Sequence, residues 1–68
     1  MNAKDVVLEL ARIRVAKEIS QYELSLRLEK SHSYIHDVEK GKNKLTLEAF
    51  LAICEQLEID PASVFAGN

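Results

Sequence analysis

The stretch "SQYELSLRLEKSHSYIHDVEKG", Ser20 to Gly41, carries the clearest local signals in the chain. It opens on a capping box, in which the Ser20 hydroxyl and the Glu23 carboxylate can satisfy each other's free backbone N–H groups. A short helix is therefore predicted from residue 21 to about residue 28. Ser31 can cap the next helix along the chain, which runs to about residue 40. Gly41 suits the left-handed position just past the end of that helix. Two short helices joined by a three-residue turn are predicted here.

Helical signals continue on both sides of this stretch. Apolar residues recur at helical spacing from residue 3 to residue 17, Thr46 can cap a further helix, and Asp60-Pro61 suits the start of a single-turn helix that ends near Phe65. The residues expected to face inward are Val6, Val7, Leu10 and Ile13; Leu24 and Leu28; Ile35 and Val38; and Leu47, Phe50, Leu51, Cys54 and Leu57. With only two glycines and one proline, the chain is predicted to be all-α, a bundle of five short helices in one domain, residues 1–68.

Two charged residues interrupt the inward-facing pattern. Arg14 lies one turn after Leu10 on the first helix, and Glu39 lies one turn after Ile35 on the third. A lone charge that faces a core destabilises a protein unless it is paired. We therefore expect a structural ion pair between Arg14 and Glu39 that ties the first helix to the end of the third. The alternative is that both side chains reach out to water.

Length and composition restrict the classes of function. A 68-residue chain buries too little surface to enclose a deep substrate cleft beside its core, and no Cys–His or Ser–His–Asp set occurs at plausible spacing, so an enzyme is not expected. No apolar run approaches the ~20 residues of a membrane span, and the start lacks a signal-peptide pattern. The single cysteine, Cys54, cannot form an internal disulfide and is expected to be a buried, unreactive thiol. A cytoplasmic protein with no small-molecule substrate is the expectation.

The distribution of charge is more informative than its sum. The net charge of −2 argues mildly against a nucleic-acid partner. However, all nine Lys and Arg residues lie in residues 1–44, against seven acids there, whereas residues 45–68 hold four acids and no base. The chain therefore has a weakly basic part and an acidic part.

The two helices of residues 20–41 and the turn between them have the arrangement of a helix-turn-helix. The surrounding sequence resembles the Cro/CI-type (Xre-like) helix-turn-helix domain of phage repressors and bacterial transcriptional regulators. The features that carry the resemblance are Arg14, Ser20-Gln21, Leu24, Ser25, Ser31, Ser33-Tyr34-Ile35, Glu39, Gly41, Leu47-Glu48, Asp60-Pro61 and Phe65. The resemblance spans roughly residues 10–65. It implies a lambda-repressor-like fold, double-stranded DNA as the partner, and dimers that bind palindromic operators.

The chain departs from the family pattern in three places. Many members have glycine in the turn where this chain has Glu29, and a non-glycine residue in a left-handed conformation costs about 1 kcal/mol. The next residue is often apolar and is Lys30 here. The outward face of the third helix carries neither Arg nor Gln, which are the commonest base-reading side chains.

The outward face of the third helix, about residues 32–40, is the expected DNA-reading surface. The candidates for reading base edges in a major groove are His32, Ser33, His36 and Asp37. The candidates for binding phosphates are Gln21, at the start of the second helix, and Lys40, Lys42, Asn43 and Lys44, after the third. The alternative for the "KGKNK" stretch is a solvated loop.

His32 and His36 lie four residues apart, which is also a spacing for two metal ligands. The stretch lacks the Glu of an H-E-x-x-H motif and an evident third ligand on another segment. The helices also supply a core without a structural metal. Neither a metal nor a cofactor is therefore expected.

The C-terminal quarter holds apolar residues that a short end helix does not need for capping a core. A symmetric homodimer patch could be formed by Leu57, Ile59, Val64 and Phe65. The alternative is that Val64 and Phe65 only close the bottom of the core. A dimer would set two recognition helices about one DNA turn apart, ~34 Å.

The sequence thus favours a small standalone transcriptional regulator, of the repressor or controller type, that binds double-stranded DNA sequence-specifically. The alternative function is a protein-interaction module that keeps the fold but has lost DNA binding. The net charge of −2 and the Asp37 carboxylate on the reading face motivate this alternative.

Overall fold

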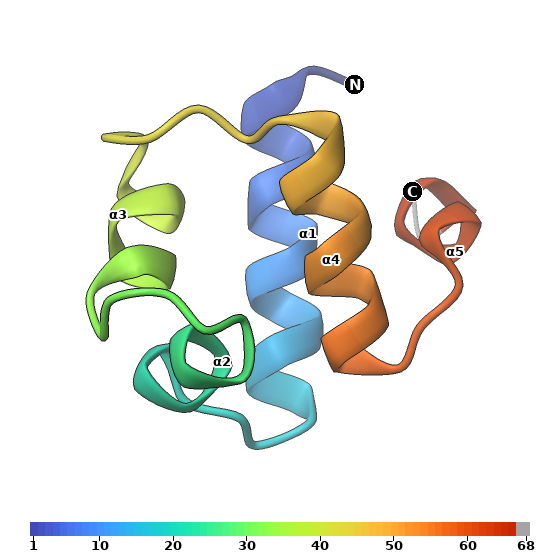
Figure 1. The fold of residues 1–68 in the computed structure, drawn as a ribbon. Helices are drawn as coiled ribbons and strands as arrows, with labels where there is room; N and C mark the ends of the chain where they lie inside the picture. Colours follow the sequence, from blue (N-terminus) through green and yellow to red (C-terminus); the bar gives the residue numbers. More distant parts are fainter. Residues whose placement is uncertain (67–68) are drawn as a thin grey trace.

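The structure is a computed structural model that describes residues 1–66, so the last two residues of the predicted domain, 67 and 68, lie outside the described residues. The described part is all-α, and its helices are α1 (Ala3–Ala16), α2 (Gln21–Arg27), α3 (Tyr34–Lys40), α4 (Leu47–Leu57) and α5 (Pro61–Ala66). Helices α2 and α3 lie on one side of α1 and α4, and α5 lies on the other (Figure 1). None of the described helices is long and apolar enough to cross a membrane.

Local hydrogen bonds explain where the first two helices begin. Asn2 and Asp5 form a complete capping box at α1, with the Asp5 N–H 2.9 Å from the Asn2 Oδ1 atom. Ser20 caps α2 as predicted, because its hydroxyl accepts from the Glu23 N–H at 2.9 Å. The predicted return bond from Glu23 is wrong: its carboxylate pairs with Arg27, one turn along, at 2.9 Å.

The predicted signals at the end of α3 and at the starts of α4 and α5 are present. Thr46 caps α4 by accepting from the Ala49 N–H, and the Asp60 carboxylate accepts from the Ala62 N–H at the start of α5. Gly41 follows α3 with a φ of 86°, in the left-handed region that glycine adopts without strain. Glu29 has a φ of 58° in the turn between α2 and α3. It therefore adopts the left-handed conformation that destabilises a non-glycine residue, as expected from the sequence.

Helix α3 begins later than predicted. Its first residue is Tyr34, and residues 31–33 form a turn in which the Ser31 carbonyl accepts from the Tyr34 N–H at 3.0 Å. Ser31 is therefore not the N-cap; Ser33 occupies that position without a side-chain capping bond. The physical reason lies in α2, because the Ser25 hydroxyl accepts from the free Ile35 N–H in the first turn of α3.

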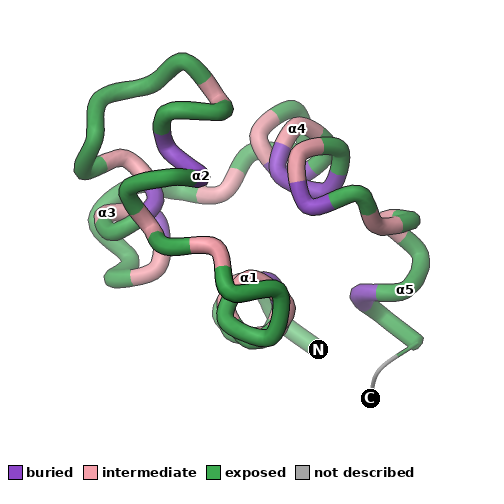
Figure 2. The backbone as a smooth tube through the Cα atoms, turned by 90° about the horizontal axis from the view of Figure 1, so that it is seen from below, coloured by how far each residue is buried: buried purple, intermediate pink, exposed green. Residues whose placement is uncertain are grey.

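The core lies between all five helices (Figure 2). Its buried apolar residues are Leu10, Leu24, Ile35, Val38, Phe50, Ile53, Cys54, Leu57 and Val64. The prediction for α4 was wrong in part, since Leu47 is 73% exposed, Leu51 is 47% exposed, and Ile53 is buried instead. The buried residues of α4 follow the spacing 50, 53, 54, 57, and Leu51 lies about 100° around the helix from Phe50.

Candidate nucleic-acid interface

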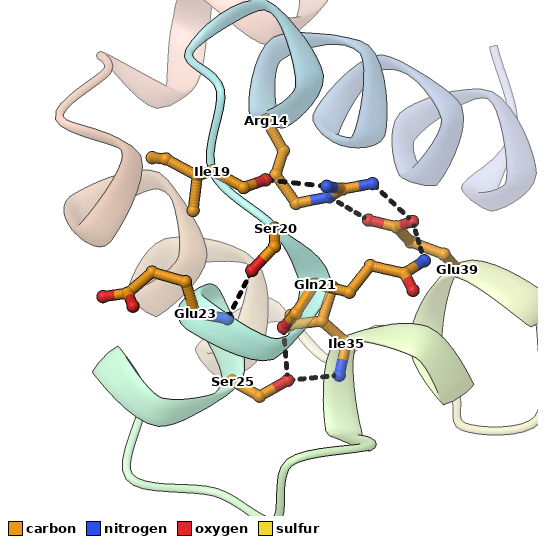
Figure 3. Close-up of polar contacts among 8 residues, drawn as sticks. All are labelled: Arg14, Ile19, Ser20, Gln21, Glu23, Ser25, Ile35 and Glu39. Carbon is orange, nitrogen blue, oxygen red and sulfur yellow. Dashed lines mark hydrogen bonds and ion pairs between the residues drawn. The ribbon is translucent and has the colours of Figure 1, made fainter.

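An ion pair and the hydrogen bonds around it hold α1, α2 and α3 together (Figure 3). The Arg14 guanidinium donates to Glu39 through Nε to Oε2 at 2.8 Å and through Nη2 to Oε1 at 3.2 Å. Its Nη1 atom donates to the Ile19 carbonyl at 2.7 Å, and the Gln21 side-chain amide donates to Glu39 Oε1 at 2.7 Å. The end of α1, the start of α2 and the end of α3 are therefore joined through one carboxylate.

A buried serine makes a second link between α2 and α3 (Figure 3). The Ser25 hydroxyl donates to the Gln21 carbonyl at 2.8 Å and accepts from the Ile35 N–H at 3.0 Å. The Ser25 side chain is fully buried and small, so the two helices approach closely at this point. Together, Ser25 and the ion pair fix the angle between the two helices of the helix-turn-helix.

The predicted base-reading residues gather at the N-terminal end of α3. Ser33 is the N-cap, His36 and Asp37 lie in the first turn, and His32 lies in the turn before the helix. Ser33, His32 and His36 are exposed, and Asp37 is half-buried. The His36 Nδ1 atom is 3.5 Å from the Asp37 Oδ1 atom, at the limit of an interaction. These polar side chains are therefore presented together at one end of a helix that is packed against the core by Ile35 and Val38.

His32 is held by a neighbour that the sequence pattern did not reveal. The helix does not support His32, because α3 starts two residues later. Instead, the His32 ring lies against the Tyr22 ring of α2, with 5.9 Å between the ring centroids. Tyr22 is 57% exposed, and only its position beside Gln21 at the start of α2 could have marked it. Tyr22 thus lies beside the predicted base-reading residues.

The predicted phosphate-binding residues line the adjoining edge. Lys40 ends α3, and Lys42, Asn43 and Lys44 follow in the exposed loop to α4. This loop is anchored by the Asp37 carbonyl, which accepts from the Lys42 N–H at 2.9 Å and from the Asn43 N–H at 3.4 Å. These lysines form no ion pair with any of the described residues.

Gln21 is placed differently from the lysines. Its side-chain amide nitrogen donates one hydrogen to Glu39, which leaves one N–H of that group for an outside acceptor. Gln21 is also the first residue of α2, where backbone N–H groups have no acceptor within the helix. The bond to Glu39 therefore orients the Gln21 side chain, and it also leaves that side chain with one fewer N–H group for an outside acceptor.

The structure corrects the residues predicted for a dimer patch. Leu57 and Val64 have exposed fractions of 1% and 0%, because both pack in the core, so they offer no surface to a partner. Ile59 is half-buried and also packs against the core. Phe65 is 53% exposed, and its ring contacts that of Phe50 with 5.9 Å between the centroids.

The described residues show no arrangement for catalysis by a metal or a thiol. Within residues 1–66, no group of three or more His, Cys, Asp or Glu side chains is placed to hold a metal ion. Cys54 is completely buried, and its burial raises the pKa of the thiol, with the Asp60 carboxylate adding to the effect. The thiol is therefore kept in its neutral, unreactive form.

Two solved structures are similar to this chain. The clp gene regulator ClgR from C. glutamicum matches with a TM-score of 0.84 and 22% identity, over 94% of this chain and 83% of that one. The restriction-modification controller protein C.AhdI from Aeromonas hydrophila matches with a TM-score of 0.78 and 30% identity, over 90% of this chain and 92% of that one. No curated protein matches the sequence.

A family model described as helix-turn-helix matches residues 10–64, which is most of the chain. The match covers both linking groups, Arg14–Glu39 and Ser25, and all the predicted base-reading residues. The family is one of DNA-binding transcriptional regulators and not of enzymes. The chain belongs to the Cro/CI-type (Xre-like) helix-turn-helix family and has its lambda-repressor-like fold.

Proposed function

We propose that this protein regulates transcription by binding a specific double-stranded DNA sequence, with the N-terminal end of α3 in the major groove. The observation that carries the proposal is the contrast within α3. Its inner side is fixed by the Ser25 hydroxyl and by the ion pair at Glu39, whereas its outer side presents unburied polar groups. A rigid helix with a polar N-terminal end suits the recognition helix of a helix-turn-helix.

The proposed reading residues have matching partners on base edges. His32 and His36 can donate to guanine N7 or O6, Ser33 can pair with either kind of edge, and Asp37 can accept from the cytosine amino group. Phosphates repel a carboxylate, so Asp37 must reach a base. Lys40 lies one turn further along α3 and reduces this repulsion.

Phosphate contacts would set the position of α3 in the groove. We assign them to Gln21 on one side of the recognition helix and to Lys40, Lys42, Asn43 and Lys44 on the other. Contacts on both sides fix the register of the helix but carry no sequence information themselves. They also make affinity depend on salt, because each neutralised phosphate releases counterions.

We further propose a homodimer on a palindromic operator, with a contact surface revised by the structure. Exposed apolar side chains gather at the start of α4 and on α5, around a hollow of about 290 Å³ that includes Val6, Leu47 and Phe65. A second copy of this protein is the proposed partner at this surface, because a palindromic operator has two equivalent half-sites and so suits a two-fold symmetric dimer. Sedimentation equilibrium tests this surface: Leu47→Asp should shift a dimer to the monomer, and an equal dimer fraction in this variant would exclude the surface.

C.AhdI suggests the biological setting of such a regulator. It is a restriction-modification controller protein, and this chain covers 92% of it at 30% identity. A controller role for this protein is therefore part of the proposal, as is its location in the cytoplasm with the DNA.

A protein-interaction module remains the second candidate function, because the net charge is −2 and Asp37 lies on the reading face. Titration with random duplex DNA at about 50 mM salt separates the two candidates. A DNA-binding regulator should bind weakly and lose affinity steeply as salt rises, since Lys–phosphate contacts release counterions. No binding at that salt concentration would contradict DNA binding and support the interaction module.

A further inference from the structure

A groove lies beside the reading face, between the start of α1 and the end of α3. It has a volume of about 420 Å³. The side chains that matter here come from α1, α3 and the following loop: Lys4, Val7, Val38, Lys40, Lys44 and Leu45. We infer that this groove holds a phosphodiester of the DNA backbone and that Lys4 is a further phosphate-binding residue. This inference rests on the proposed DNA binding.

The charge of the groove favours an anion. Lys4, Lys40 and Lys44 line it from two segments that are far apart in the sequence, and no carboxylate of the described residues pairs with them. Glu39 also lines the groove, but its carboxylate accepts from Arg14 and from Gln21. Three lysines therefore line a groove in which the one carboxylate of the lining, Glu39, is already compensated by Arg14.

The acidic residue next to Lys4 in the sequence, Asp5, already has a hydrogen-bond partner. Asp5 accepts from the Asn2 N–H through Oδ2 at 3.2 Å, as the second half of the α1 capping box. This bond holds the carboxylate at the helix terminus. Lys4 is thus left as a cation without an ion-pair partner among the described residues.

The apolar residues are the more buried part of the groove lining. Val38 of α3 is buried, and Val7 of α1 and Leu45 of the loop are half-buried, whereas the three lysines are exposed. The apolar side chains therefore form the floor of the groove and the lysines its rim. A DNA backbone presents a deoxyribose next to each phosphate, so an apolar floor under a cationic rim matches both parts of a nucleotide backbone unit. The exclusion of water by such a floor also strengthens an ammonium–phosphate contact.

The position of the groove favours DNA over another phosphate source. Lys40 and Lys44 are shared between the groove and the proposed phosphate-binding loop, so a duplex held by that loop passes the groove. Lys4 extends this row of contacts onto α1, to which the sequence pattern assigned no DNA contact. Its contribution should be independent of DNA sequence, because it meets only the backbone.

The test measures affinity for random duplex DNA as a function of salt in four proteins: the wild type, Lys4→Gln, Lys44→Gln and Lys30→Gln. Lys30 is the matched control, since it loses the same charge but lines a separate groove with Glu48 and Ala52 of α4. We expect Lys4→Gln and Lys44→Gln each to lower the slope of log affinity against log salt by about 1. Lys30→Gln should keep the wild-type slope.

The outcomes separate this inference from the proposed function. Equal slopes for Lys4→Gln and Lys30→Gln, with a lower slope for Lys44→Gln, would overturn the role of Lys4 and leave DNA binding intact. No salt-dependent binding by the wild type would overturn both. A loss of affinity in Lys4→Gln for only some DNA sequences would also contradict a backbone contact.

A second arm distinguishes DNA from free phosphate as the occupant. Inorganic phosphate is added to the DNA-binding assay at constant ionic strength. We expect no change in the affinity of the wild type, because free phosphate lacks the sugar that would contact the apolar part of the lining. If phosphate weakens the wild type but not Lys4→Gln, the groove binds free phosphate, and its assignment to the DNA backbone is wrong.

Discussion

The guanidinium of Arg14 on α1 donates to both carboxylate oxygens of Glu39 on α3, at 2.8 and 3.2 Å. Their side chains are only 11% and 17% exposed, so neither charge is well hydrated by water. The Glu39 carboxylate also accepts from Gln21, so this pair determines how α3 lies against α1 and α2. Removing one partner would leave the other charge partly buried and unpaired.

Glu39→Ala should therefore lower the free energy of unfolding by about 3 kcal/mol, measured by urea denaturation. The double variant Arg14→Met/Glu39→Leu should recover most of this loss, because it leaves no unpaired charge. Glu23→Ala is the matched control, since Glu23 pairs with Arg27 at the surface and should cost less than about 1 kcal/mol. Equal small losses in Glu39→Ala and Glu23→Ala would show that the Arg14–Glu39 pair behaves as a surface pair.

Ser25→Ala should destabilise the protein by about 1–3 kcal/mol, because it removes the only acceptor that the described residues provide for the buried Ile35 N–H. Ser33→Ala is its control: Ser33 is exposed and makes no capping bond, so its loss should stay within about 0.5 kcal/mol. Chemical denaturation of both variants gives the comparison. A Ser25→Ala variant as stable as Ser33→Ala would exclude a capping role for Ser25.

Cys54 should make stability fall at alkaline pH. Burial raises the pKa of its thiol in the folded protein, so the stabilisation is complete below the unfolded thiol pKa of about 8.5 and is lost as pH rises toward the folded pKa. Urea denaturation from pH 7.5 to 10 should show a steeper decline for the wild type than for Cys54→Ala. Parallel curves for the two proteins would count against a thiol titration linked to folding.

Tyr22 should affect base reading through His32, whose ring it contacts. Tyr22→Ala should weaken binding to a selected operator roughly 3- to 10-fold, as expected for an aromatic contact, and weaken random duplex less. Tyr22→Phe keeps the ring and should bind like the wild type. In the His32→Ala background, Tyr22→Ala should cause little further loss. Additive losses would mean that Tyr22 contacts DNA independently of His32.

Local patterns in the sequence predicted most of the fold. Capping side chains marked the starts of α2, α4 and α5, and apolar spacing placed Leu10, Leu24, Ile35 and Val38 in the core. These signals act within a few residues, so the sequence shows them directly. The expectation that Arg14 faces Glu39 followed from similar reasoning, since two charges on apolar faces need partners.

The tertiary contacts that place the start of α3 and His32 could not be predicted in the same way. The start of α3 depends on Ser25, ten residues earlier, and the position of His32 depends on the Tyr22 ring. Whether an apolar residue is buried depends on the neighbouring helices. The apolar spacing therefore wrongly placed the exposed Leu51 in the core, and it left open whether Val64, which is buried, faces a partner or closes the core. For the same reason, the predicted dimer patch contained core residues.

Selection of bound sequences from a random duplex pool tests the central claim, sequence-specific DNA binding, most directly. We expect enrichment of a palindrome whose half-sites are about one helical turn apart, ~34 Å, with G·C pairs at the positions that the histidines and Asp37 read. His36→Ala should relax the preference at one position of each half-site. A pool that shows no enriched sequence after repeated rounds would contradict sequence-specific binding by α3.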